Sequence, residues 1–140
     1  MIALEAAIHT ALVDDVELRS LIGTYKGAPA VFTQPLPQDA KKGLPYVIIS
    51  GVIADNDFDT STTRGREIGL NLRCYSQIST DSTDIENIAE RLRKIFHRVK
   101  VPVGGYKTLD VTVSGPINAP TSSPDLLGRV LALTFTLEEE

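Results

Sequence analysis

The sequence is poor in the features that would support a redox or nucleic-acid role. Its single cysteine, Cys74, excludes an internal disulfide and fits a reducing compartment. Basic residues are outnumbered, with 14 lysines and arginines against 18 aspartates and glutamates and a net charge of -4. This balance argues against a protein that grips nucleic acid by neutralising phosphates, so we expect no specific nucleic-acid ligand.

Long hydrophobic runs are also missing. The strongest apolar run, Tyr46–Ile49, is far shorter than the roughly 18 residues that a membrane-spanning helix needs. The N-terminal residues Met1–Glu5 lack the basic region of a signal peptide. We therefore expect no membrane partner, and a soluble intracellular protein with one domain over residues 1–140.

Apolar residues recur at helical spacing in three places. Residues 2–13 and 16–22 predict a short N-terminal helix pair, in which Asp14 or Asp15 caps the second helix and Gly23 ends it. Residues 84–99 predict one long helix, acidic at its start and basic at its end, as the helix dipole favours. Its apolar stripe consists of Ile85, Ile88, Ala89, Leu92, Ile95, Phe96 and Val99.

Alternating or β-branched segments predict the strands. Residues 30–33 predict a short edge strand, and residues 45–53 and 64–75 predict a strand pair. After the long helix, residues 108–116 and 131–137 alternate again, with Leu109, Val111 and Val113 expected on one face. The predicted fold class is α+β: a mainly antiparallel sheet of four to five strands, with the long helix packed on one face.

Three aspartates in the predicted loop 54–63 are the first candidates for chemistry. Asp55, Asp57 and Asp59 have the spacing that starts an EF-hand calcium loop, but Thr60 replaces its glycine and Arg66 its final glutamate. A two-metal nuclease would also need a supporting histidine or lysine on a rigid element. We therefore expect a solvated, mobile loop and no metal ligands.

The remaining reactive side chains do not form a catalytic set. His9 and His97 lie in predicted helices with no third group to complete a triad. Cys74 alternates inward with Leu70 and Leu72, which is typical of a buried hydrophobe. The sequence has no nucleophile elbow, Walker loop or dinucleotide fingerprint. We expect no catalytic residue, no cofactor and no enzyme activity.

The basic run 91–100 could contact phosphate from a helix, but two other readings compete with this one. A solvated face is the simpler one, because its charges fit the dipole rule and flank an apolar stripe. Alternatively, this face receives the acidic loop 54–63 of a neighbouring subunit. That pairing would explain two otherwise unrelated features of the sequence.

The order of these segments resembles the tail-completion, or tail terminator, family of long-tailed phages and prophages. The similarity runs through Val13–Gly23, Leu44–Ile49, Asp57–Thr62 and Ile68–Ser76, and the long helix and last strand pair complete the plan. The match spans almost the whole chain, but its motifs are structural and gain their weight from order and spacing. The family has no active site.

The resemblance implies a virion protein assembled in the host cytoplasm. It implies a ring, typically of six subunits, that caps the finished tail tube and joins it to head connector proteins. Its partners would be other copies of itself, the tail tube protein and the connector, with DNA passing through the ring. A closed ring needs two different complementary surfaces on each subunit. The residues expected at these interfaces are Asp55, Asp57, Phe58, Asp59, Arg64, Arg66, Arg91, Arg93 and Lys94.

Three other readings stay open from sequence alone. The first is a different head–tail neck component, which only its location in the particle separates from a terminator. The second is a metal-dependent enzyme that uses Asp55, Asp57 and Asp59. The third is a small cytosolic adaptor that binds a peptide on an open sheet edge and stays monomeric.

Overall fold

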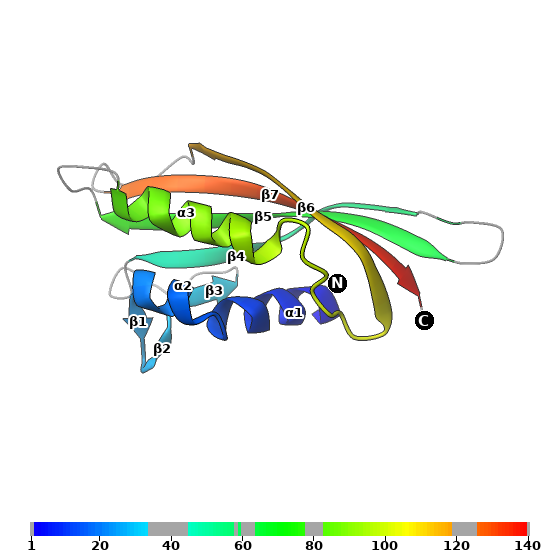
Figure 1. Cartoon of the computed structure of the whole chain (residues 1–140), viewed down its shortest axis with the longest axis horizontal. Coiled ribbons are helices and arrows are strands. Elements are labelled where there is room, and N and C mark those ends of the chain that lie inside the picture. The colour runs from blue at the N-terminus through cyan, green and yellow to red at the C-terminus, as the bar shows by residue number, and fades with distance from the viewer. Residues whose placement is uncertain are drawn as a thin grey trace.

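The computed structural model describes residues 2–33, 45–57, 59, 64–77, 83–118 and 126–139. Two helices and a small hairpin come first, and long strands alternate with one further helix after them (Figure 1). The elements are α1 (Ile2–Val13), α2 (Val16–Leu21), β1 (Thr24–Tyr25), β2 (Ala28–Pro29), β3 (Val31–Thr33), β4 (Tyr46–Asp57), β5 (Gly65–Gln77), α3 (Thr83–Phe96), β6 (Tyr106–Asn118) and β7 (Leu126–Glu139).

The main sheet has five strands in the order β3-β4-β5-β7-β6. Its β4–β5, β5–β7 and β7–β6 pairs are antiparallel, whereas β3 runs parallel to β4. Strands β1 and β2 form a separate two-stranded sheet. The α+β class is confirmed, but the predicted sheet was wrong in detail, because the five-stranded sheet is mixed and a second sheet lies beside it.

The expectation of one long helix covering the sheet was also wrong. Helix α1 has 12 residues and α3 has 14, and both contribute to the same core on one face of the sheet (Figure 1). Leu4, Ile8 and Leu12 of α1 are fully buried there, because their spacing places them along one side of the helix. Within the described part of the chain, no helix is long and apolar enough to cross a membrane.

Helix ends follow local chemistry only in part. Asp15, one of the two aspartates predicted for this role, is the N-cap of α2, and its side chain accepts a hydrogen bond from the Leu18 amide at 2.9 Å. Gly23 does not close that helix through a left-handed conformation; its N–H donates to the Pro45 carbonyl instead. Helix α3 stops at Phe96, before the predicted end, and Arg98 adopts a positive φ of 61° just beyond it.

The strands are longer than their sequence patterns suggested, because pairing with a long neighbour continues past the apolar segments. Strand β4 extends to Asp57, opposite Arg66 of β5, so Asp55 and Asp57 lie on a strand rather than in a loop. In β6 the register shifts between Thr108 and Asp110. This bulge turns Thr108 inward and leaves Leu109 half-exposed, so Leu109 was wrongly placed with Val111 and Val113.

A second, smaller cluster lies on the opposite face of the sheet, where β3 and β4 pair. Phe32, Tyr46 and Tyr75 are buried there and meet edge-on or tilted, with ring centroids 5.6 and 5.7 Å apart. Tyr25 of the β1–β2 hairpin packs against Phe32 at 5.2 Å. The aromatic cluster therefore fixes the small hairpin to one end of the main sheet.

Candidate interaction surface

The far ends of β4 and β5 run past the helices and form a projection, which we call the arm (Figure 1). The arm consists of residues 53–57 of β4, Asp59 and Arg64 of the connection, and residues 65–67 of β5. Strand β3 pairs with β4 only at Val47, Ile48 and Ile49. Beyond these residues the outer edge of β4 has no strand partner within the described part of the chain, and Ile53 is 64% exposed. The arm therefore combines an open sheet edge with an exposed apolar side chain.

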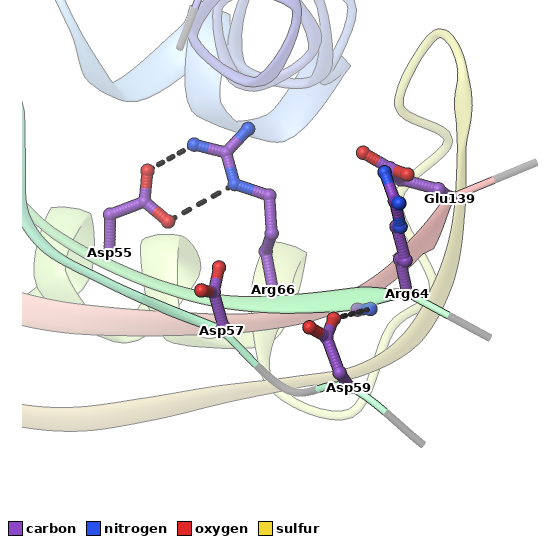
Figure 2. Close-up of a pocket in the computed structure, with 7 residues that line it drawn as sticks. Asp55, Asp57, Asp59, Arg64, Arg66 and Glu139 are labelled. Carbon is purple, nitrogen blue, oxygen red and sulfur yellow. Dashed lines mark hydrogen bonds and ion pairs between the residues drawn. The ribbon is translucent and has the colours of Figure 1, made fainter. Parts of the chain in front are cut away.

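A concave surface of about 580 Å³ lies on the arm, and charged side chains dominate it (Figure 2). Carboxylates from the end of β4, from Asp59 in the β4–β5 connection and from the end of β7 meet two arginines there. Its lining residues are Asp55, Asp57, Asp59, Arg64, Gly65, Arg66 and Glu139. Five of the nine predicted interface residues thus come together at one place, because the β4–β5 pairing brings them into register.

Arg66 and Asp55 form the tightest contact of this surface. The Arg66 Nε donates to Asp55 Oδ1 at 3.1 Å and its Nη2 contacts Asp55 Oδ2, so both carboxylate oxygens are engaged (Figure 2). These hydrogen bonds lower the pKa of Asp55 and raise that of Arg66, to which Tyr106 also contributes. Arg66 and Asp55, both predicted for the interface, therefore form an ion pair with each other inside the subunit.

The other charges of the arm are less constrained. Asp59 accepts a hydrogen bond from the Gly65 amide at 3.3 Å, which closes the base of the connection. Arg64 is exposed beside Glu139, whose amide donates to the Arg64 carbonyl at 2.8 Å. Asp57 is exposed and forms no ion pair with any other described residue. Phe58, also predicted for the interface, lies outside the described residues, as do residues 60–63 of the expected mobile loop.

The basic end of α3 is mostly engaged within the subunit, which the sequence did not reveal. Arg91 donates to Asp15 through Nε at 2.8 Å and Nη2 at 2.6 Å, and its Nη1 lies 3.2 Å from Glu17. Hydrogen bonds from Arg91 are the main reason that the pKa of Asp15 lies below its ordinary value. Arg91 therefore joins α3 to the start of α2.

The segment from Arg93 to Arg98 covers the outer edge of β6. Arg93 Nη1 donates to the Val113 carbonyl at 3.1 Å and to the Gly115 carbonyl at 3.3 Å. The Val113 amide donates to His97 Nδ1 at 3.2 Å, and the Arg98 amide donates to the Val111 carbonyl at 2.8 Å. These bonds satisfy the edge groups of β6 that no strand reaches.

Lys94 differs from its neighbours on α3. Its side chain is exposed and makes no ion pair or hydrogen bond with the rest of the described chain. Of the three α3 residues predicted for the interface, Lys94 alone has no ion-pair or hydrogen-bond partner among the described residues. No sequence rule separates it from Arg91 and Arg93, because the difference depends on which tertiary partners lie nearby.

The side chains considered as metal ligands or as a nucleophile are the three aspartates of the arm and Cys74. The described residues contain no group of three or more His, Cys, Asp or Glu side chains arranged to hold a metal ion. Cys74 is fully buried, as predicted, and burial raises its thiol pKa to about 12. Such a thiol is not a nucleophile near neutral pH. The Asp55 oxygens face Arg66, a cation that competes with any metal at this position.

Comparisons with known proteins give a structural likeness only. No protein-family model matches the chain, and no curated protein matches its sequence. A chain from the virion of a native gene transfer agent particle aligns with 96% of this chain and 94% of its own length, at a TM-score of 0.76 and 15% identity. A second solved protein aligns with 99% of this chain and 94% of its own, at a TM-score of 0.52 and 16% identity. At these identities the likeness establishes the shared fold.

Proposed function

We propose that this chain is a structural, non-enzymatic protein of a virion, and that it acts as a tail terminator. In this role a ring of copies, six by analogy with the family, caps the completed tail tube and joins it to the head connector. The observation that carries the proposal is the near full-length fold match, with a TM-score of 0.76, to a chain of a gene transfer agent virion. The family resemblance in segment order, read from the sequence, supports the same role.

The shape of the subunit fits a head-to-tail ring. Such a ring needs two unlike surfaces that complement each other on neighbouring copies. The arm is one candidate surface, because it projects from the helices and carries Asp57 and Asp59 (Figures 1 and 2). The exposed face of α3 around Lys94 is the other, since its lysine has no partner within the described subunit. We propose that the arm of one subunit contacts this face of the next.

Charge reversal at Lys94 tests that contact without disturbing the subunit. Lys94→Glu should leave the melting temperature almost unchanged, because the side chain is exposed and unbonded, but should weaken ring assembly. Arg19→Glu on α2 is the matched control, because Arg19 is also exposed. Native mass spectrometry would show the effect, and equal assembly of both variants would exclude Lys94 from the interface.

The location of the chain tests the function itself. Gold-labelled antibody against this chain should mark purified particles once, at the junction between head and tail. Label on the head shell or at the distal tip would contradict a neck role. Particles assembled without the chain separate the terminator from another neck component, since an uncapped tube should keep growing. Tails of normal length would favour the other neck component.

One observation supports the adaptor reading: beyond Ile49, the outer edge of β4 pairs with no strand in the described part of the chain. An extended peptide can add to such an edge through backbone hydrogen bonds. That function requires a stable monomer at all concentrations and no attachment to tail tubes. Both properties are measured in the experiments on assembly, so the same data decide between the two functions.

A further inference from the structure

Arg66 connects two strands that are not neighbours in the sheet. It lies on β5, opposite Asp57 of β4 on one side and Leu137 of β7 on the other. Its Nε and Nη2 bind Asp55 of β4, while its Nη1 donates to the Tyr106 hydroxyl of β6 at 3.1 Å. One guanidinium therefore links β4 to β6 across β5 and β7, and we call this contact the clasp.

The position of the clasp gives it influence over the direction of the arm. Two register shifts interrupt the β4–β5 pairing, between Ile49 and Val52 and between Val52 and Ala54. Such bulges bend a strand and increase its twist, so regular pairing alone does not determine where the end of β4 points. The arm also lies beyond the helices that cover the rest of the sheet (Figure 1). A bidentate contact just past the bulges can therefore set the angle of the arm.

The planar guanidinium of Arg66, with its fork of N–H donors, is suited to setting the angle of the arm. A bidentate guanidinium–carboxylate pair fixes direction as well as distance, which a lysine ammonium does not. The side chains are 28% and 36% exposed for Arg66 and Asp55, so the pair adds little to the global stability of the subunit. The Arg66–Asp55 pair therefore acts on the orientation of the arm more than on the stability of the subunit.

We propose that Arg66 is the positioning residue of the arm, and that the clasp sets the angle at which the arm meets the next subunit of the ring. This inference rests on the proposed function, because it assigns Arg66 a role in that assembly. Arg66 itself does not need to touch the neighbouring subunit. Its role is to hold Asp55 and the end of β4 in one orientation relative to β6.

The test measures the angle of the arm separately from assembly. Spin labels at Asn56→Cys on the arm and Asn87→Cys on α3 report their separation, since both sites are exposed and the native Cys74 is buried. We expect a narrow distance distribution in the monomer and a clearly wider one in Arg66→Met. Arg66→Lys should widen it too, because the charge remains but the fork is lost. Tyr106→Phe removes one hydroxyl and should give a smaller change.

Assembly and stability complete the experiment. Without the labels, Arg66→Met should raise the concentration needed for ring formation by about five-fold and lower the melting temperature by less than about 3 °C. Unchanged distance distributions in Arg66→Met and Tyr106→Phe would overturn the clasp even if rings form. If the distance distribution widens in Arg66→Met but the wild-type protein never forms rings, the result would support the clasp and contradict the proposed function. The two failures are thus distinguishable.

Discussion

The two edges of the main sheet differ in how their backbone groups are satisfied. At the β6 edge, side chains and one amide from Arg93, His97 and Arg98 bond the groups at Val111, Val113 and Gly115. At the β4 edge, pairing with β3 ends at Ile49, and the described chain provides no further strand. The β6 edge is therefore closed by the subunit itself at these residues, whereas the arm at the β4 edge is open within the described chain.

This difference separates folding from assembly. The charges at the end of α3 look like a binding surface in the sequence, yet most of them stabilise the subunit. The arm, in contrast, keeps exposed groups such as Ile53 and Asp57. Substitutions on the closed side should therefore change the free energy of unfolding, and substitutions on the arm should change association.

The largest effect is expected in the core beneath the closed edge. Phe96 is fully buried at the end of α3 and packs against Phe135 with ring centroids 6.5 Å apart. Phe96→Ala should reduce the free energy of unfolding by about 3–5 kcal/mol, because it leaves a cavity. Urea unfolding followed by circular dichroism measures this loss. If Phe96→Ala lowered the free energy of unfolding no more than a substitution on the arm does, the proposed difference between the two regions would be contradicted.

The second prediction concerns the N-cap that Arg91 secures. Asp15→Ala should cost about 1–2 kcal/mol, since it removes the cap of α2 and the partner of Arg91. Asp15→Asn is the matched control, because asparagine caps helices well but has no charge. It should recover part of the loss in the same denaturation measurement.

The Asp15 pair also predicts a pH dependence. Arg91 lowers the pKa of Asp15 in the folded state, so the unfolded chain binds the proton more readily. The ionised Asp15 therefore contributes its full stabilisation of the folded state above its ordinary pKa of 3.8. This stabilisation disappears as the pH falls through the lowered pKa of the folded state. The stability advantage of the wild type over Asp15→Asn should shrink below about pH 4. A constant difference down to pH 2 would contradict the pairing.

Opening the covered edge should have a smaller energetic effect. Arg93→Met removes the donor to the Val113 and Gly115 carbonyls and should cost about 0.5–1.5 kcal/mol. It should also expose part of the β6 edge, so light scattering should detect new, non-specific association. If Arg93→Met stays as soluble as the wild type, the arginine is not needed to protect this edge.

The smallest change in stability is expected on the arm. Ile53 is 64% exposed, so Ile53→Ser should alter the free energy of unfolding by no more than about 0.5 kcal/mol. We nevertheless expect it to weaken association, because an exposed isoleucine on the arm can be buried only by another molecule. Sedimentation velocity over a concentration series would measure this. Val16→Ser, at an apolar site of α2 that is 72% exposed, is the control.

Periodicity in the sequence was enough to predict the helices and strands, but not how the strands pair and in which register. Helix α1 was predicted correctly, and the N-cap of α2 was narrowed to Asp14 or Asp15, because both features depend on residues close in the sequence. The parallel pairing of β3 and the bulge at Leu109 were not, since they depend on strands distant in the chain. The extension of β4 to Asp57 likewise comes from its partner, β5, rather than from β propensity.

The contacts within the candidate surface could not be read from the sequence. Asp55, Asp57 and Asp59 are close in the sequence and line one concave surface, and their role at an interface stays a prediction. It could not show that Arg91 binds Asp15, 76 positions away, or that Arg66 reaches Tyr106, 40 positions away. A charged side chain carries no local signal for its tertiary partner, so charge pattern alone overestimates the available interface.

The most direct test of the account is the native mass of the purified wild-type protein over a concentration series, with negative-stain images of the same samples and of samples mixed with tail tubes. The account predicts a closed ring with a central hole, either free in solution or at the end of the tube. A protein that stays monomeric at every concentration and leaves tube ends bare would contradict it.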